Sequence, residues 1–471
     1  MNEFRLDHAV VIGGSMAGVL TAQALSERFD RVTVIERDRL PEGPMIRKGV
    51  PQERHVHAFW AGGMRILESL LPGVRESLLD AGAVPLAMPT DTAWMTPAGR
   101  WTQRFPATQS VVSASRPLLE WAVRNQVCKT PSIRFLEEHE VTALRQGTDG
   151  DIVGVDLRDR STGTRLHLSA QLVVDASGRR SKLPDWLAAL GLSVPRETVI
   201  DASLGYATRV YDVPDRLETR WKAVYIQSAA PEHPRGGIMF PIEGHRWVLT
   251  LIGTGGDHPP TDEDGFLKFA ASLRHRLLAD AIGAAEPASP IWGFRRTENR
   301  WRHYEKLSMP AGLLAIGDSL CAFNPVYGQG MTVAAKEVEA LRRVLQECRS
   351  SSDLPRVTRA AQKAIASRVK GPWMIATGND LRSPNTVGAS QTPIDRLVNK
   401  YLDRILAAVA DDPVVNAAFL RVLNLIDEPT ALFAPRLAAR VLRRRRFKDA
   451  TQPDPVRVLS PTGSLSRKEP A

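Results

Sequence analysis

The sequence has few cysteines and no long apolar run, and each absence excludes a class of protein. Three cysteines among 471 residues, without a Cys-x-x-Cys pair or metal-ligand spacing, are typical of a protein of the reducing cytoplasm. No run is apolar over the roughly 20 residues that a membrane-spanning helix needs. The apolar segment 8–25 contains the glycines of a strand–helix turn and follows no basic region, unlike a secretion signal. We therefore expect a cytoplasmic protein with no integral membrane segment.

Nucleic-acid-binding motifs and metal-ligand clusters are missing too. The net charge is +10, but the basic residues are scattered along the chain, which indicates an arginine-rich composition and no nucleic-acid partner. His55 and His57 would face opposite sides of a strand, and no third ligand is near, so we expect no metal. With 43% hydrophobic residues, the chain is long enough for several globular domains.

A strand–helix–strand pattern at residues 9–36 is the most informative stretch. The apolar run 9–12 breaks at two glycines, a helical pattern follows from Met16 to Arg28, and a second strand-like run ends in Glu36. Such a turn brings backbone N–H groups and the positive end of a helix to a pyrophosphate. Glu36 suits ribose hydroxyls and would repel a 2′-phosphate, which favours FAD or NAD over NADP. A structural turn without a nucleotide is the alternative.

The glycine fingerprint of this turn departs from the usual pattern at one position. It comprises Gly13, Gly14, Ser15, Ala17 and Gly18, with a serine in place of the middle glycine. A basic loop follows Glu36 and ends in Arg47 and Lys48, which could contact phosphate or adenosine or could be solvated charges. Ser115 is a candidate N-cap of a helix whose first residue, Arg116, could face a cofactor or the solvent.

Two further strand ends carry an acid and a glycine. Residues 133–174 resemble a meander of four strands that ends in Asp175, with Gly178 shortly after. The apolar run 313–316 ends in Gly317-Asp318, and a Gly/Pro-rich loop then leads into a helix at 332–346, whose N-terminus can stabilise negative charge. Asp318 could bind a hydroxylated chain such as ribityl.

The remaining segments predict a second sheet and C-terminal helices. Residues 203–253 are β-patterned and rich in aromatics, of which Tyr206, Tyr225, Phe240 and Trp247 could line an apolar pocket or belong to the core. A helix is expected at 357–369, with a turn-rich segment from Pro372. Asp412-Pro413 is expected to cap a later helix, and a last helix from Pro435 ends in a run of arginines.

Three motifs in order make the chain resemble a known family. They are the fingerprint with Glu36, Asp175-x-x-Gly178, and Gly317-Asp318 followed by Pro325-x-x-Gly328-x-Gly330. The chain resembles the FAD-dependent monooxygenases of the aromatic-hydroxylase-like superfamily. Segments 47–57, 104–109 and 322–328 resemble more narrowly the flavin epoxidases of polyether polyketide biosynthesis.

The resemblance implies an α/β fold with a Rossmann-like FAD-binding domain, an inserted β-sheet substrate domain and a C-terminal helical region. The expected boundaries are 1–75, 106–190 and 300–350 for the first, 76–105 and 191–299 for the second and 351–447 for the third, followed by a disordered tail at 448–471.

The resemblance and the motifs together define the candidate site. The cofactor-binding candidates are Gly13, Gly14, Ser15, Ala17, Gly18, Glu36, Arg37, Arg47, Lys48, Arg116, Asp175, Gly178, Gly317, Asp318, Pro325, Gly328, Gly330 and Met331. The catalytic candidates are Pro325, Asn324 and Tyr327, and the substrate-contacting candidates are Tyr206, Phe240, Trp247 and Phe323. In the family that the chain resembles, a proline carbonyl at the position of Pro325 accepts a hydrogen bond from the peroxide.

The activity implied is insertion of one oxygen atom from O2, through a flavin C4a-hydroperoxide, into an apolar substrate that is free or carried by a partner protein. Alkene epoxidation is the expected reaction, with NAD(P)H as electron donor, directly or through a flavin reductase. The alternatives are an aromatic hydroxylase and an FAD-dependent reductase or dehydrogenase of a prenyl or polyene chain. A halogenase would need a Trp-x-Trp-x-Ile-Pro segment, which the sequence lacks. A non-enzymatic flavin-binding module would not need the loop at 325–330.

Overall fold

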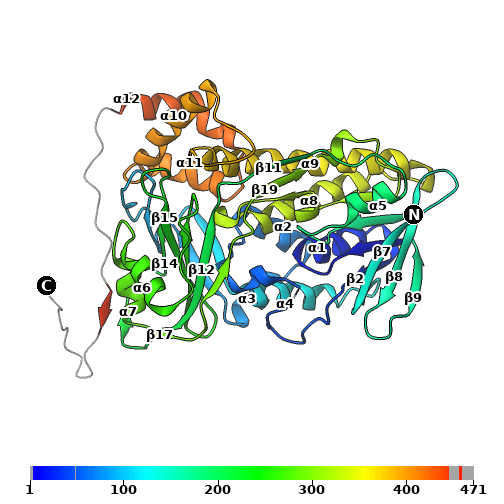
Figure 1. The fold of residues 1–471 in the computed structure, drawn as a ribbon, viewed down its shortest axis with the longest axis horizontal. Coiled ribbons are helices and arrows are strands. Elements are labelled where there is room, and N and C mark those ends of the chain that lie inside the picture. The colour runs from blue at the N-terminus through cyan, green and yellow to red at the C-terminus, as the bar shows by residue number, and fades with distance from the viewer. Residues whose placement is uncertain (1–3, 48, 445–455, 459–471) are drawn as a thin grey trace.

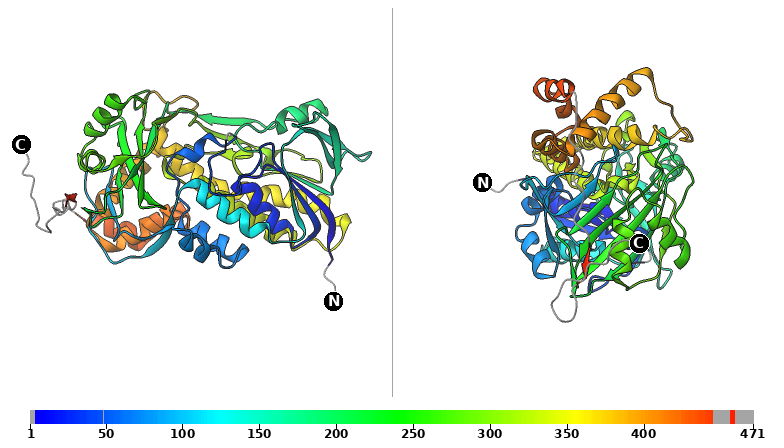
Figure 2. Two further views of the ribbon diagram at one scale, coloured as in Figure 1. Left: turned by 90° about the horizontal axis from the view of Figure 1, so that it is seen from below. Right: turned by 90° about the vertical axis from the view of Figure 1, so that its left-hand side faces the viewer.

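The computed structural model describes residues 4–47, 49–444 and 456–458. Figure 1 shows two sheet-containing parts side by side, with long helices along the top of the right-hand part and the C-terminal helices above the left-hand part. Figure 2 shows the same two parts from below and from one end.

A parallel sheet forms the first part. Its five strands are, in spatial order, β20 (Leu313–Ala315), β10 (Leu172–Asp175), β1 (Leu6–Ile12), β2 (Phe29–Ile35) and β6 (Ile133–Leu136). These strands are apolar because helices cover both faces of such a sheet. The helices of this part are α1 (Met16–Leu25), α2 (Ala61–Leu70), α3 (Val74–Asp80), α4 (Arg116–Val127), α5 (Leu183–Ala189) and α8 (Gly330–Leu345). Ile12 pairs with both Ile35 and Asp175, so the chain leaves three strands at one edge.

The expected meander at 133–174 is wrong in one respect. Its first and last strands, β6 and β10, belong to the parallel sheet, and the segment between them forms a separate antiparallel sheet. That sheet contains β7 (His139–Gln146), β8 (Ile152–Asp159) and β9 (Arg165–Ser169). Short alternating runs predict strands but do not reveal their partners.

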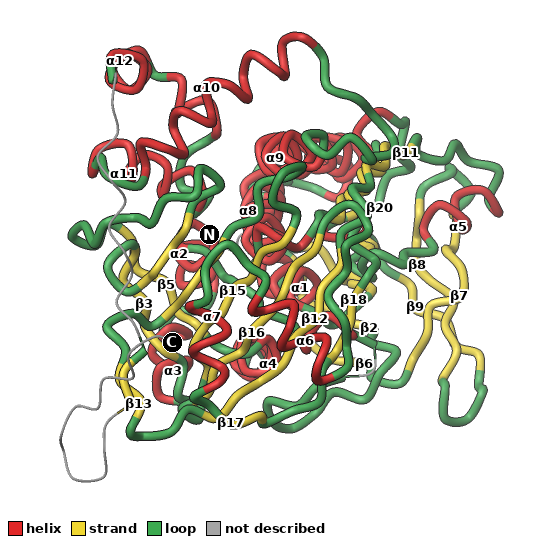
Figure 3. The backbone as a smooth tube through the Cα atoms, turned by 60° about the vertical axis from the view of Figure 1, so that its left-hand side comes forward, coloured by secondary structure: helices red, strands yellow, loops and turns green. Residues whose placement is uncertain are grey.

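A seven-stranded sheet forms the second part. Its strands are β17 (Glu286–Pro287), β12 (Gly205–Asp212), β16 (Arg246–Gly253), β15 (Arg235–Ile242), β14 (Ala223–Ile226) and β4 (Thr92–Met95), with β18 (Trp292–Phe294) paired to β12. The apolar side chains of one face form a core with α6 (Glu263–Ala271) and α7 (Leu277–Gly283). Figure 3 shows these two helices on the outer face of the sheet. The apolar side chains of the opposite face pack mainly with the C-terminal helices.

Smaller sheets complete the described part of the chain. They are β3 (Val84–Met88) with β5 (Gln109–Ser113), β11 (Glu197–Ile200) with β19 (Asn299–Arg302) and β21 (Cys321–Ala322), and β13 (Leu217–Glu218) with β22 (Arg457–Val458).

The helix predicted at 357–369 is longer in the structure than the sequence indicated. The helix predicted to end before Pro372 continues through it, as α9 (Leu354–Asp380). It is followed by α10 (Pro393–Val409), α11 (Pro413–Leu423) and α12 (Pro435–Arg443). Most of the predicted disordered tail lies outside the described residues. Within the described part of the chain, every helix is too short or too polar to cross a membrane.

The predicted caps at Ser115 and Asp412 are confirmed. The Ser115 hydroxyl accepts a hydrogen bond from the Leu118 N–H, and the Asp412 carboxylate accepts from the N–H groups of Val414 and Val415. Asp412 also pairs with Arg440 at 2.7 Å and with Arg444 at 2.9 Å, so it joins α11 to the end of α12.

We expect Asp412→Ala to lower the thermal unfolding midpoint more than Asp412→Asn, because asparagine keeps the cap and loses only the ion pairs. Loss of the cap alone costs about 1 kcal/mol. Circular dichroism of the two variants measures the difference. Asp403→Ala is the control, since its pair with Arg382 is at the surface and contributes little. Equal midpoints for Asp412→Ala and Asp403→Ala would contradict this role.

Candidate active site

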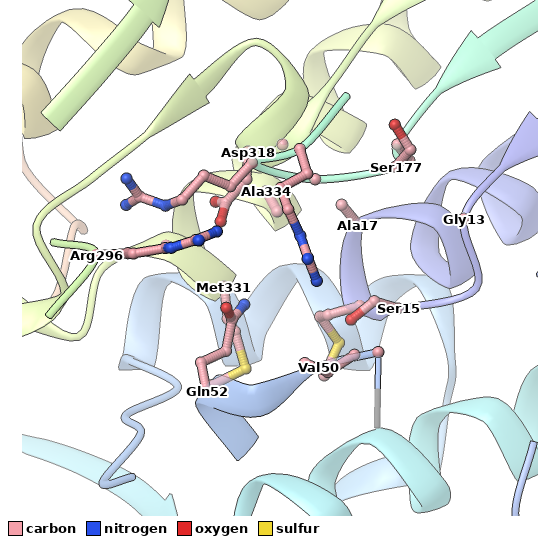
Figure 4. A pocket seen from close by; sticks show the side chains of 18 of the residues that line it. Gly13, Ser15, Ala17, Val50, Gln52, Ser177, Arg296, Asp318, Met331 and Ala334 are labelled. Atoms are coloured by element: carbon pink, nitrogen blue, oxygen red, sulfur yellow. The ribbon is translucent and has the colours of Figure 1, made fainter. Parts of the chain in front are cut away.

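A cavity of about 1080 Å³ lies at the edge of the parallel sheet where the strand ends meet. Residues of all three predicted motifs line it, together with Phe294 at the end of β18 in the other sheet. Figure 4 shows side chains from both parts around this space. The sites predicted from separate stretches of sequence therefore meet in one place.

Two glycines allow α1 to approach the end of β1. Gly13 has φ +104°, and a Cβ there would lie 2.6 Å from the Ala176 carbonyl oxygen. A Cβ on Gly18 would lie 1.8 Å from the Gly13 carbonyl oxygen, so only glycine fits. Ser15 is the N-cap residue of α1, but its side chain does not cap the helix and donates to Glu120 instead. The positive end of α1 lies beside the cavity without a side-chain cap.

The Glu36 carboxylate lines the cavity and is held by backbone groups. It accepts hydrogen bonds from the N–H groups of Gly14, at 2.8 Å, and Asp38, at 3.0 Å. Arg37 also lines the cavity, and its guanidinium donates to the Gly49 carbonyl. Gly14 does not line the cavity but orients the acid that does.

A buried ion network, not the cavity, holds Arg47. Its side chain is 3% exposed and pairs with Glu120, with Glu53 at 3.2 Å and with Glu36 at 3.5 Å. Arg47 is absent from the cavity lining, so the structure does not support direct contact with phosphate. Lys48 lies outside the described residues.

Arg116 links this network to the cavity. It lines the cavity, donates to Glu120 at 2.8 Å through Nε, and lies 3.2 Å from the Ser15 hydroxyl. Burial alone would raise the pKa of Glu120, but Arg116 and Arg47 hold it well below its ordinary value. A charged Glu120 thus fixes Arg116 beside the N-terminus of α1.

Asp318 faces the cavity with a free carboxylate. Among the described residues, no side chain or backbone group donates a hydrogen bond to it. Burial raises its pKa, and Arg179 and Arg116 oppose the shift. The preceding Gly317 donates its N–H to the buried Glu337 of α8 at 2.6 Å. Glu337 fixes this turn, and sequence reasoning missed it because a lone acid on a helix carries no motif.

Asp175 does not reach the cavity. It is 0% exposed and accepts hydrogen bonds from the Ser177 N–H at 3.0 Å and the Ser181 hydroxyl. Ser177 and Gly178 line the cavity in its place. The prediction that Asp175 contacts the cofactor is therefore corrected: Asp175 shapes the loop that does line the cavity.

Asn324 holds the loop that begins at Pro325. Its Oδ1 accepts from the Val326 N–H at 3.0 Å and from the Tyr206 hydroxyl at 3.3 Å. Its Nδ2 donates to Asp380, the last residue of α9, at 3.0 Å. These bonds occupy the carboxamide, so Asn324 orders Pro325, Gly328 and the following helix and is not a free catalytic group.

Asp380 is the residue that sequence reasoning missed at this end of the site. It is buried, accepts from both Asn324 and Asn299, and lies beyond the proline at which the helix was expected to end. The acid would have been a candidate only if α9 had been recognised to continue through Pro372.

The predicted substrate residues lie at different places. Phe323 lines the cavity, while Tyr206 packs against Phe294, with ring centroids 6.5 Å apart. Phe240 packs in the cluster that contains the C-terminal helices. Trp247 lies on the opposite face against Trp221, so its prediction as a pocket residue is wrong.

Tyr327 is also absent from the lining. Its carbonyl accepts from the Trp60 indole at 2.9 Å, and its ring packs against the core of the first part. The other predicted residues in the lining are Gly13, Ser15, Ala17, Gly317, Asn324, Pro325, Gly328, Gly330 and Met331, whereas Gly18 is not in it.

His57 lines the cavity, although the sequence analysis assigned it no functional role. Its Nδ1–H donates to the His55 carbonyl at 2.9 Å, which leaves Nε2 as an acceptor. Burial, with help from Arg116, lowers its pKa to about 3, so the ring is neutral at physiological pH. Within the described residues, no cluster of three or more His, Cys, Asp or Glu could hold a metal.

These features fit a dinucleotide with a hydroxylated chain. The close approach of α1 to β1 at Gly13 and Gly18 brings the N-terminus of α1, which has no side-chain cap, to the cavity. The Glu36 carboxylate at the end of β2 can accept hydrogen bonds from a ligand. The Asp318 carboxylate, which has no hydrogen-bond donor among the described residues, can do so too. The arrangement is that of a flavin-binding α/β fold with a second sheet above the site.

The comparisons with known proteins agree with this class. The family described as FAD binding domain matches residues 7–354. Protein Rv3254 of Mycobacterium tuberculosis is 32% identical over 429 residues, 89% of this chain and 90% of that one. Squalene monooxygenase of Mus musculus is 24% identical over 76% of this chain and 58% of its own length. The solved structure of the flavin-dependent brominase Bmp2, 15% identical, has the same fold, with a TM-score of 0.66 over 93% of this chain and 98% of that one.

The chain therefore belongs to the FAD-binding domain family. It is an enzyme of the FAD-dependent monooxygenase superfamily, with FAD as its cofactor and O2 and a small molecule as its substrates.

We expect Asp318→Ala to weaken FAD binding by roughly 10- to 100-fold, since a carboxylate hydrogen bond contributes about 1.5–3 kcal/mol. The ratio of flavin to protein absorbance after gel filtration measures FAD retention. Unchanged far-ultraviolet circular dichroism serves as the folding control. A variant that retains one FAD per chain like the wild type would contradict the role of Asp318.

We also expect a pH-dependent contribution from Asp380. Burial raises its pKa from 3.8 to about 6, with its Asn324 and Asn299 hydrogen bonds opposing. The folded protein holds this proton more tightly than the unfolded chain does. The contribution of Asp380 to the free energy of unfolding therefore falls as the pH rises from about 4 to 6 and is constant above that range. The thermal midpoint of the wild type relative to Asp380→Asn should fall over that range. A pH-independent difference would contradict this assignment.

Proposed function

We propose that the enzyme inserts one oxygen atom from O2 into an apolar natural-product substrate, with epoxidation of an alkene as the reaction. The observation that carries the proposal is an apolar cluster beside the loop at Pro325. It comprises Leu204, Tyr206 and Ile252, with Ile238, Phe294 and Val326 packed against it. The resemblance of segments 47–57, 104–109 and 322–328 to flavin epoxidases also supports it.

The cofactor would lie along the cavity. We propose that Glu36 binds the adenosine ribose, that the end of α1 with Ser15 and Arg116 binds the diphosphate, and that Asp318 binds the ribityl chain. The loop from Pro325 to Met331 would then lie beside the isoalloxazine, with the positive end of α8 behind it.

FAD supplies the oxygen activation when it is bound, so the protein needs few reactive side chains. In this proposal the apolar cluster excludes water and holds the substrate. The Pro325 carbonyl, which accepts the Gly328 N–H at 2.9 Å, would accept a second hydrogen bond from an O–H group at the reacting centre. His57, with its pKa lowered to about 3, is a weak base for removing a phenol proton. This property favours epoxidation over the second candidate, hydroxylation of an aromatic ring.

Stopped-flow absorbance tests the proposal. The FAD-loaded enzyme is reduced anaerobically with dithionite, which removes the question of whether NAD(P)H acts directly or through a reductase. It is then mixed with ¹⁸O₂ in the presence of geraniol or 4-nitrophenol. We expect a transient species distinct from reduced and oxidised flavin, and ¹⁸O in an epoxide product.

A pair of variants sharpens the test. Phe294→Leu opens the apolar cluster and should shorten the lifetime of the transient, whereas Trp247→Phe, on the far face, should not. Direct return to oxidised flavin with both probes would favour the reductase or dehydrogenase alternative. Label in the phenol product alone would favour the aromatic hydroxylase.

A further inference from the structure

Arginines are abundant around the cavity, and most of them are neutralised by carboxylates. Arg116, Arg179, Arg300 and Arg302 each pair with a glutamate, Lys182 pairs with Glu140, and Arg37 lies 4.0 Å from Asp38. Arg180, Arg295 and Arg296 also line the cavity, are exposed, and have no hydrogen bond or ion pair to another described residue. They are the lining cations left without a counter-charge in the described part of the chain.

These three arginines belong to two loops that are clamped together. Arg180 follows β10, and Arg295 and Arg296 follow β18. Between them, the Arg179 guanidinium donates to the Glu298 carbonyl at 2.6 Å and pairs with the Glu298 carboxylate at 3.2 Å. The clamp holds like charges near one another, which raises the positive potential at this side of the cavity and favours an anion there.

The diphosphate of FAD does not account for this charge. The proposed diphosphate site is at the end of α1, beside Gly13 and Ser15. In Figure 4, Arg296 extends from the side of the cavity opposite those two residues. Arg296, and with it the loop that carries Arg295, therefore faces a different ligand.

The apolar cluster of the proposed substrate site lies next to Arg295 and Arg296 in the chain. Phe294, which stacks on Tyr206 and packs against this cluster, immediately precedes Arg295 in the chain. A substrate whose apolar part lies against Phe294 would extend its other end toward Arg295 and Arg296.

We propose that Arg180, Arg295 and Arg296 bind an anionic terminus of the apolar substrate, either a carboxylate or the phosphate of a thioester carrier group. This inference rests on the proposed function and narrows its substrate class to amphipathic chains with one anionic end. Guanidinium groups suit both anions because they donate paired hydrogen bonds to carboxylate and phosphate oxygens.

Binding to the oxidised, FAD-loaded enzyme tests the inference without turnover. Palmitoleate, palmitoleyl alcohol and palmitoleoyl-coenzyme A are titrated at low salt, and the perturbation of the flavin spectrum reports binding. We expect palmitoleate, the coenzyme A ester or both to bind about tenfold or more tightly than the alcohol. The anionic ligand that binds more tightly than the alcohol identifies the source of the anion, a free carboxylate or a carrier phosphate.

Two double variants locate the effect, and a control double variant on α12 removes the same charge as the alanine pair. Arg295→Ala/Arg296→Ala should abolish the preference for the anionic ligand, and Arg295→Lys/Arg296→Lys should retain part of it. The control, Arg436→Ala/Arg443→Ala, removes two exposed arginines of α12 and should leave the preference unchanged.

Three results would overturn the inference: no preference for an anionic ligand, a preference that survives in Arg295→Ala/Arg296→Ala, or an effect of that variant only on the rate at which NADPH reduces the flavin. If the anionic preference is present but no ¹⁸O is transferred, the proposed oxygenation fails while the binding site stands.

Discussion

The close crossing of α1 over the end of β1 is the constraint on which the site depends. With 1.8 Å between the Gly13 carbonyl oxygen and a Cβ built on Gly18, the crossing tolerates only glycine. It fixes the positive end of α1 at the edge where β1, β2 and β10 end together. The acid at the tip of β2 and the loop after β10 then border the same cavity, because parallel strands in register end at one edge.

Two polar networks hold the cavity from opposite sides. At one end, Glu120 joins the buried Arg47 to Arg116, and these charges are tolerable in the interior because each is paired. At the other end, Asp380 of α9 holds Asn324 and with it the loop at Pro325. The C-terminal helices thus contribute directly to the geometry of the reactive end, although the FAD-binding domain family matches only residues 7–354.

Local signals were predictable, and long-range pairing was not. The fingerprint turn, the caps at Ser115 and Asp412 and the turn at Gly317 follow from neighbouring residues and were visible in the sequence. Trp247 was misassigned because strand alternation gives two faces without saying which one borders the site. Asp380 was missed because Pro372 ordinarily ends a helix, and here tertiary packing carries α9 through it.

A crystal structure of the FAD complex would show whether this cavity holds the flavin with its ring at the Pro325 loop. We expect a ribose oxygen within hydrogen-bonding distance of Glu36, the diphosphate at the end of α1, a ribityl hydroxyl on Asp318 and the ring beside residues 325–331. An adenosine away from Glu36, or a ring distant from Pro325, would contradict this expectation.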